Sequence, residues 1–195
     1  MLIIGLTGSI GMGKTTTAGF FRAAGIPVHD ADAAVHRLYN GPAAATVEAA
    51  FPGTAPDGVV DRDRLAEVVL DDSRALKRLE AIVHPLVREA ERAFLEAAAE
   101  AGAPMAVLEI PLLFETGGDN RCDAIVVVTA RPETQRQRVL KRPGMSEDRL
   151  NALLARQTPD AEKRRRAHFL VITDYDLDFA KRQVIAVVRA LAASV

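Results

Sequence analysis

The residues with the clearest chemical meaning are residues 8–15, GSIGMGKT, which match the pattern G-x-x-x-x-G-K-[ST] in full. Glycines allow a backbone to wrap closely around phosphate oxygens with its N–H groups turned inward. A helix that starts directly after the loop adds the positive end of its dipole. Lys14 supplies a positive charge for the β- and γ-phosphates, and the Thr15 hydroxyl suits Mg²⁺. The sequence therefore predicts a site for a nucleoside triphosphate.

Two carboxylates, Asp30 and Asp32, follow the short apolar segment 26–28. Open α/β sheets bind their ligands at the carboxyl ends of the strands. A carboxylate in that place can orient the hydroxyl that accepts a phosphoryl group. Either residue can equally cap a helix that begins near Ala33. The residues alone leave catalysis and capping open for this pair.

A basic stretch extends from residue 131 to residue 166 and is divided by Pro143-Gly144, which predicts a helix, a turn and a helix. A kinase must keep water away from the phosphoryl group that it transfers, and a helical lid that carries arginines does so. The alternative is a solvated amphipathic helix pair. Because a P-loop precedes the stretch in a short chain, we expect a lid at about 133–160 whose arginines close onto the phosphates; the basic residues of the stretch include Arg136, Arg138, Lys141, Arg142, Arg149 and Arg156.

The elements that must position these groups follow from the hydrophobic pattern. Apolar segments predict strands at 2–6, 26–28, 105–110, 123–128 and 168–172, and helical patterns occupy 15–24, 133–141, 147–156 and 180–193. This alternation is typical of a parallel sheet covered on both faces. We therefore expect a three-layer α/β P-loop fold with about five parallel strands.

Residues 33–102 interrupt this alternation. Their apolar residues recur at helical spacing, as in Leu76, Leu79, Ile82 and Val83. We expect a mostly helical insertion between the second and third strands, within a single domain that spans residues 1–195.

Composition and charge restrict the class of protein. The chain has 195 residues, is 49% hydrophobic and carries a net charge of −1, which gives no reason to expect a nucleic-acid or membrane partner. The single Cys122 cannot form an intrachain disulfide, and the apolar start breaks at Gly5 without a basic region. These features predict a soluble cytoplasmic protein. The oligomeric state is left open, a monomer included.

Several segments together resemble the dephospho-CoA kinase family, which completes coenzyme A synthesis. They run in order over nearly the whole chain: 5–15 (GLTGSIGMGKT), 30–32 (DAD), His84-Pro85 with Arg88, 109–115 (EIPLLFE), 142–146 (RPGMS), 155–157 (ARQ), and Lys163 with Arg165 and Ala167. The resemblance implies a kinase that uses ATP and Mg²⁺ to phosphorylate the ribose 3′-hydroxyl of dephospho-CoA.

The resemblance also implies roles for individual residues. Asp32 would face the 3′-hydroxyl, while Lys14 and Arg142 would stabilise the transferring phosphate and Arg156 would be a further lid residue. Thr15 would ligate Mg²⁺. The ATP cradle would consist of Gly11, Met12, Gly13, Lys14, Thr15 and Thr16.

On the acceptor side the resemblance implies His84, Arg88 and the turn formed by Pro111, Leu112, Leu113 and Phe114. Without the family, His84 before a proline indicates a helix-end or core histidine, and residues 112–114 indicate core. The family's Asp-Asn-x-Gly turn near the adenine is replaced here by residues 173–176, TDYD, so the adenine contacts stay open.

Three other functions fit the P-loop less well. They are a different small-molecule kinase, a regulatory module that binds ATP without transferring phosphate, and a simple ATPase. The chain lacks the Asn-Lys-x-Asp motif by which GTPases recognise guanine. The rate of ADP formation with and without an acceptor distinguishes the remaining possibilities.

Overall fold

A computed structural model describes residues 1–70 and 72–193 of the chain. The chain divides into two compact units. The sheet unit comprises Met1–His29 and Ala98–Val195, and the helical unit comprises Asp30–Ala97. The expectation of a single domain over residues 1–195 stays a prediction.

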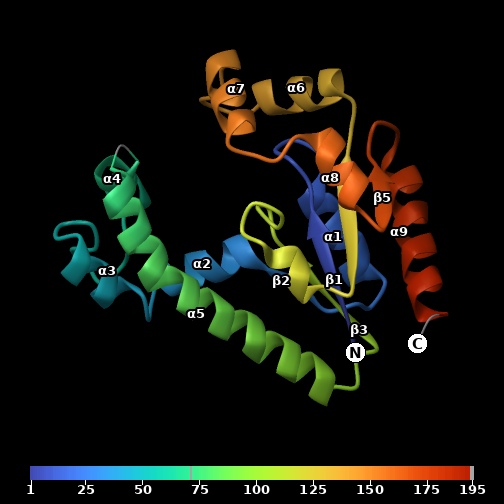
Figure 1. The fold of residues 1–195 in the computed structure, drawn as a ribbon, viewed down its shortest axis with the longest axis horizontal. Helices are drawn as coiled ribbons and strands as arrows, with labels where there is room; N and C mark the ends of the chain where they lie inside the picture. The colour runs from blue at the N-terminus through green and yellow to red at the C-terminus, as the bar shows by residue number, and fades with distance from the viewer. Residues whose placement is uncertain (71, 194–195) are drawn as a thin grey trace. The chain divides into compact units, whose positions relative to one another are not determined.

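The sheet unit is built on one five-stranded sheet with the strand order β2-β3-β1-β4-β5 (Figure 1). β1 pairs in parallel with both β3 and β4, and β4 pairs in parallel with β5. The strands are β1 (Leu2–Thr7), β2 (Val28–Asp30), β3 (Met105–Glu109), β4 (Ala124–Thr129) and β5 (Phe169–Ile172). Every residue of β3 and β4 is buried, as in parallel sheets that helices cover on both faces. The predicted α/β fold is confirmed.

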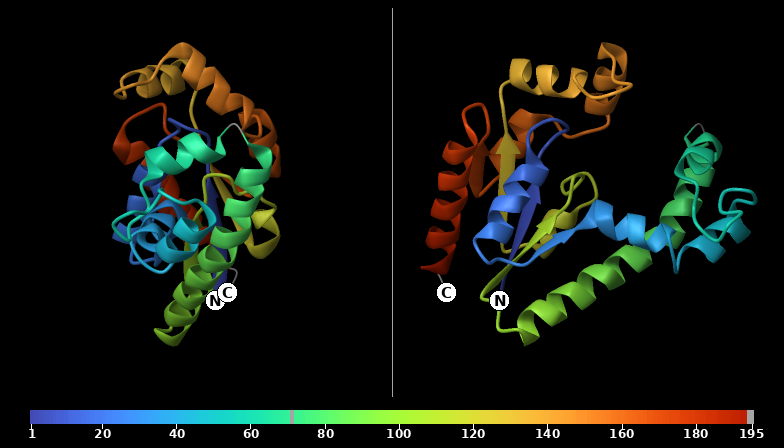
Figure 2. Two further views of the ribbon diagram at one scale, coloured as in Figure 1. Left: turned by 90° about the vertical axis from the view of Figure 1, so that its left-hand side faces the viewer. Right: turned by 180° about the vertical axis from the view of Figure 1, so that it is seen from behind.

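Helices cover both faces of this sheet (Figure 2). α1 and α9 pack against each other on one face, and α8 packs against β4 on the other. Their apolar side chains join those of the strands in one core that includes Ile4, Leu6, Phe21 and Val184. The helices of this unit are α1 (Lys14–Ala23), the 3₁₀ helix η1 (Gly118–Arg121), α6 (Pro132–Leu140), α7 (Glu147–Ala155), α8 (Asp160–Arg166) and α9 (Leu177–Ala192).

The connection from α1 to β2 places the strand later than the sequence predicted. Gly25 has a φ of 80° and ends the helix, with bonds from Gly25 N–H to Arg22 O and from Ile26 N–H to Phe21 O. Pro27 has no N–H, and its carbonyl accepts a hydrogen bond from Val107 N–H at 2.8 Å. The strand therefore begins at Val28 and ends at Asp30, instead of occupying residues 26–28.

The helical unit has its own core and a different construction. Its described residues form the helices α2 (Ala31–Tyr39), α3 (Ala44–Ala50), α4 (Arg62–Val69) and α5 (Ser73–Glu100), and the last turn of α5 belongs to the sheet unit. Leu38, Val47, Phe51, Leu65 and Val83 are among the buried side chains that pack together. The helical character expected for residues 33–102 is confirmed.

In the sheet unit, α8 and α9 differ from the prediction. α8 was not expected, because its sequence, DAEKRRR, has no apolar periodicity. α9 begins at Leu177 rather than at residue 180, since the Asp176 carboxylate caps it by accepting from Phe179 N–H at 2.6 Å. Of the helices that the structure describes, none is long and apolar enough to cross a lipid bilayer.

Candidate active site

The loop between β1 and α1 has a backbone that requires glycine. Gly11 and Gly13 have φ values of 78° and 90°, which L side chains rarely adopt. A Cβ on Gly8 would lie 2.5 Å from the Val128 carbonyl oxygen, so a side chain there is excluded by β4. These positions are the glycines of the sequence motif together with one of its variable positions. Local backbone geometry therefore explains the pattern.

α1 begins directly at the end of this loop. Its N-cap residue, Gly13, has no side chain to cap the helix, and the first intrahelical bond runs from Thr17 N–H to Gly13 O at 3.0 Å. The N–H groups of the first turn thus have no partner within the helix. Thr15 and Thr16 are exposed at this end. Such a helix start receives anions, phosphate groups above all.

Lys14 forms an ion pair with Glu109, the last residue of β3. Lys14 Nζ lies 2.8 Å from Glu109 Oε1, and the exposed fractions of the two side chains are 13% and 1%. Glu109 Oε2 lies 3.6 Å from Arg22 and, among the described residues, accepts no hydrogen bond. Sequence reasoning gave Glu109 no role. The available signal was an acidic residue at the carboxyl end of a buried strand, next to the P-loop strand.

A pocket of about 290 Å³ adjoins the loop and contains several predicted residues. Gly11, Gly13, Thr16 and Arg142 line it. Arg138 of α6, one of the basic residues of the stretch 131–166, also lines the pocket. Arg156 is exposed and is not among the residues that line the pocket. The remaining lining residues are Thr17, Phe20, Thr173, Tyr175, Asp176, Leu177 and Ala180.

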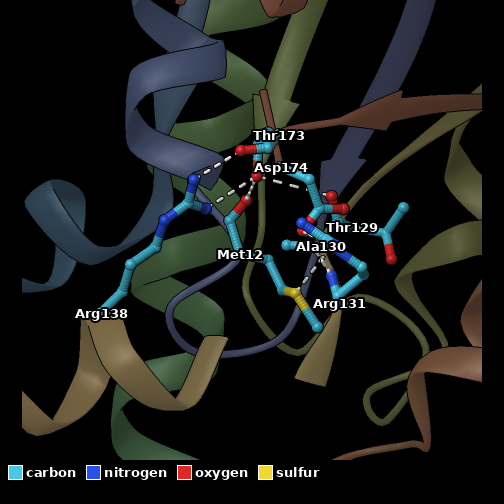
Figure 3. A network of polar contacts seen from close by, with 7 residues as sticks. All are labelled: Met12, Thr129, Ala130, Arg131, Arg138, Thr173 and Asp174. Carbon is cyan, nitrogen blue, oxygen red and sulfur yellow. Dashed lines mark hydrogen bonds and ion pairs between the residues drawn. The ribbon is translucent and has the colours of Figure 1, made fainter. Parts of the chain in front are cut away.

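The side chain of Met12 points away from this pocket into the core, where it is almost completely buried. Its sulfur accepts a hydrogen bond from Ala130 N–H at 3.0 Å, and its carbonyl accepts one from Thr173 Oγ1 at 2.8 Å (Figure 3). Arg138 Nη1 in turn donates to Thr173 Oγ1 at 2.8 Å. Met12 can therefore contribute to an anion cradle only through its backbone.

The segment that departs from the family pattern is held by a second set of polar contacts. Asp174 Oδ1 accepts from Arg131 N–H at 2.9 Å and from Arg131 Nε at 3.3 Å (Figure 3). Burial by itself would raise the pKa of Asp174, but the bonds from Arg131 and the Thr134 hydroxyl outweigh it and lower that pKa. The carboxylate thus stays ionised and fixes the turn after β5 to the end of β4.

The predicted acceptor turn at residues 111–114 divides into exposed and buried side chains. Leu112 is 41% exposed, whereas Leu113 has no exposed surface and Phe114 is buried. The Arg166 guanidinium lies 4.1 Å from the centroid of the Phe114 ring. Thr7 Oγ1 donates to Pro111 O at 3.1 Å. Leu113 and Phe114 hold the turn from within, and Leu112 is its exposed apolar side chain.

The other predicted acceptor residues belong to the helical unit. Asp30 caps α2, accepting from Ala33 N–H at 2.9 Å, and the helix starts at Ala31 rather than near residue 33. Asp32 lies exposed in the first turn of the same helix. Of the two carboxylates, Asp30 is thus the one that caps the helix.

His84 and Arg88 both lie in α5 and are exposed. Since they are four residues apart, they share one face of the helix. His84 is therefore neither a helix-end nor a core residue, although it precedes Pro85 inside the helix. How Asp32, His84 and Arg88 act on a substrate stays a prediction.

The described residues contain no group of three or more His, Cys, Asp or Glu side chains that could hold a metal ion by themselves. At phosphate-transfer sites Mg²⁺ usually takes only one or two protein oxygens, together with phosphate and water ligands. Thr15 at the start of α1 and the buried Glu109 Oε2 at the end of β3 fit such a site.

The chain resembles known proteins over nearly its full length. The family model described as dephospho-CoA kinase matches residues 2–178. A protein of Mesorhizobium japonicum named dephospho-CoA kinase is 61% identical over 191 residues, which cover 98% of this chain and 97% of that protein.

Two solved structures are similar over almost the full length. A crystal structure of the Thermus thermophilus protein TT1252 has a TM-score of 0.85 at 38% identity and covers 97% of both chains. A dephospho-CoA kinase from Campylobacter jejuni has a TM-score of 0.66 at 22% identity and covers 96% of both chains, which shows a shared fold.

Proposed function

The chain belongs to the dephospho-CoA kinase family, and from that membership we infer that it transfers the γ-phosphate of ATP to the ribose 3′-hydroxyl of dephospho-CoA. The products are ADP and coenzyme A. The observation that carries this inference is a family match over nearly the whole chain, which coincides with a glycine-built anion cradle. A P-loop alone would support only nucleotide binding.

Phosphoryl transfer needs an oriented acceptor and stabilisation of the charge on the moving group. The 3′-oxygen forms a bond to the γ-phosphorus while the bond from that phosphorus to the β–γ bridging oxygen breaks. ADP leaves with the bridging oxygen, and the hydroxyl proton passes to a base. In our proposal that base is Asp32, which first orients the hydroxyl by accepting its hydrogen bond.

Lys14 and Arg142 are proposed to stabilise the negative charge of the transferring phosphate. Lys14 comes from the start of α1 and Arg142 from the turn after α6, next to the pocket beside the cradle. Lys14 is held by Glu109, which keeps the ammonium group oriented near the loop. Bound phosphates would share this ammonium with the carboxylate. We therefore assign Glu109 to the positioning of Lys14.

Thr15 and Glu109 are the residues that would hold Mg²⁺. A bound Mg²⁺ would neutralise charge on the phosphates of ATP. The dependence on Mg²⁺ and a cytoplasmic location are parts of the proposal. Gly11 to Thr16 supply the backbone N–H groups of the cradle.

Dephospho-CoA contains a diphosphate and a pantetheine arm with both apolar and polar groups, and the proposed acceptor residues suit this chemistry. Arg88 offers a fixed positive charge on an exposed helix face, with His84 one turn before it. Leu112 offers an exposed apolar side chain on a turn that Leu113 and Phe114 hold from within. In our proposal Arg156 is a further lid residue, with a smaller role than Arg142.

The direct test measures ADP formation from Mg·ATP with and without dephospho-CoA, and coenzyme A formation in the same samples. We expect ADP formation to depend strongly on dephospho-CoA and to equal coenzyme A formation. Adenosine and other hydroxyl compounds serve as control acceptors. If turnover does not depend on dephospho-CoA but depends on another acceptor, dephospho-CoA is not the substrate. Equal turnover without any acceptor would indicate an ATPase.

A further inference from the structure

Both backbone polar groups of Ile10, inside the P-loop, are bonded to glutamine side chains from distant parts of the chain. Gln135 Nε2 donates to the Ile10 carbonyl at 2.7 Å, and Ile10 N–H donates to Gln157 Oε1 at 3.2 Å. Gln135 is buried in the first turn of α6, and Gln157 follows α7. The segment that contains α6 and α7 thus holds one P-loop residue by two side chains, one near each end of the segment. We call these two side chains the Ile10 clamp.

Further contacts of α6 extend this support along the loop. A Cβ on Gly11 would lie 2.5 Å from Val139 Cγ2 and 3.1 Å from the Gln135 carbonyl oxygen, so α6 packs directly against the Gly11 backbone. Arg138 reaches the next residue, Met12, through Thr173. Residues 135, 138 and 139 share one helix face, as their spacing requires. This face therefore supports three consecutive P-loop residues.

The two glutamines have opposite hydrogen-bonding roles. Gln135 acts as a donor to a carbonyl, and Gln157 acts as an acceptor from an N–H group. With both groups of Ile10 occupied, the peptide planes on either side of this residue are fixed. The N–H groups that follow, from Gly11 to the start of α1, then have a defined orientation before a phosphate binds.

We propose that Gln135 and Gln157 are positioning residues that hold the P-loop in its phosphate-binding conformation before ATP arrives. The role rests on the proposed function, in which this loop receives ATP. A preformed site binds more tightly because the ligand does not have to order the loop. Loss of the clamp should weaken the binding of ATP equally in the ground state and in the transition state. KM for ATP should then rise while kcat stays nearly unchanged.

The test uses substitutions that separate the donor from the acceptor. Gln157→Glu keeps an acceptor for Ile10 N–H, whereas Gln157→Ala removes it. Gln135→Glu replaces the donor by an oxygen that faces the Ile10 carbonyl, and Gln135→Ala removes the contact. Gln137→Ala is the matched control, because Gln137 lies exposed in the same helix, two residues from Gln135.

The kinetic readout is KM for ATP against kcat. For Gln157→Ala and Gln135→Ala we expect KM for ATP to rise about two- to tenfold, the range that one neutral hydrogen bond contributes. Gln135→Glu should raise it at least as much. Values of kcat and of KM for dephospho-CoA should stay within about twofold of wild type, and Gln137→Ala should match wild type throughout.

The structural readout is amide hydrogen exchange at Ile10 in the nucleotide-free protein, where no triphosphate can repel a new carboxylate. Gln157→Ala should accelerate this exchange by about tenfold or more, and Gln157→Glu should restore the protection. An unchanged Ile10 exchange rate in Gln157→Ala overturns the clamp. So does a fall in kcat with KM for ATP unchanged, since that pattern indicates loss of folded enzyme.

The two proposals fail in different ways. If the wild-type protein shows no turnover that depends on dephospho-CoA, the proposed function is wrong. Ile10 exchange and the affinity for Mg·ADP, measured by calorimetry, would then still test the clamp, and weaker Mg·ADP binding by Gln157→Ala would support it. If turnover is normal and neither measurement responds to Gln157→Ala, only the clamp is rejected.

Discussion

The P-loop and the helical unit carry their candidate residues in contrasting ways. Around the P-loop, each group is fixed by neighbours: Gly8 by the β4 backbone, Lys14 by Glu109, and Ile10 by two glutamines. In the helical unit, Asp32, His84 and Arg88 stand exposed on helices. The proposed triphosphate site is therefore held in place by packing and hydrogen bonds, whereas the proposed acceptor residues are exposed side chains on two helices.

This difference indicates where substitutions should be tolerated. A change in the P-loop disturbs packing and backbone geometry together, so stability and ATP binding should respond with activity. A change at an exposed helix position removes one functional group and leaves the fold intact.

Lys14→Ala should give the largest loss, because it deletes a positive charge that is proposed to act on the transferring phosphate. Loss of one such group typically lowers kcat by about 10²–10³-fold. The change also leaves Glu109 buried with only Arg22 nearby, at 3.6 Å, so the melting temperature should fall. Steady-state kinetics and thermal unfolding measure the two effects. Near-normal kcat in a folded variant contradicts the role of Lys14.

Asp32→Asn should lower kcat by about 10²-fold, within the usual range for loss of a general base, and leave the melting temperature unchanged. Asp30→Asn is the control, since asparagine caps helices as well as aspartate does. Kinetic constants and the affinity for ATP should be determined for both variants. If the two variants have equal kcat, Asp32 has no special part in the reaction.

Gly11→Ala should weaken ATP binding by about 10-fold or more and destabilise the protein. The new Cβ meets Val139 and the Gln135 backbone, in addition to the strain of a left-handed conformation. Gly53, in the helical unit, also has a positive φ, 85°, but open space surrounds it. Gly53→Ala should therefore lower the free energy of unfolding by about 1–2 kcal/mol and leave the affinity for ATP unchanged. Equal ATP affinities in the two variants would remove the distinction between the units.

Arg88→Ala should raise KM for dephospho-CoA by about tenfold, with KM for ATP unchanged, because the proposed charge-assisted contact to the acceptor would be lost. His84→Ala should have a similar or smaller effect. Arg92→Ala is the control, since Arg92 lies one turn further along α5 and pairs with Glu89 and Glu96. A change in KM for ATP, or an equal effect of Arg92→Ala, counts against the assignment of Arg88 to the acceptor.

Local sequence patterns determined much of the fold. The glycine spacing predicted the P-loop, because few residue types tolerate positive φ or the close approach of a neighbouring backbone. The apolar runs predicted the five strands, since β3 and β4 are buried throughout. Helical periodicity predicted residues 33–102 as mostly helical. These features depend on residues that are close together in the sequence.

Only the tertiary structure decided the contacts that join distant segments. α8 has no apolar periodicity, yet its Lys163 is completely buried, with Nζ 3.1 Å from Glu115 Oε1. Lys14 meets Glu109 across 95 positions, and Ile10 meets Gln157 across 147. Such pairs depend on the strand order that brings β1 between β3 and β4. Local propensity and periodicity contain no information on which distant side chains will meet, so these partners had to be found in the folded chain.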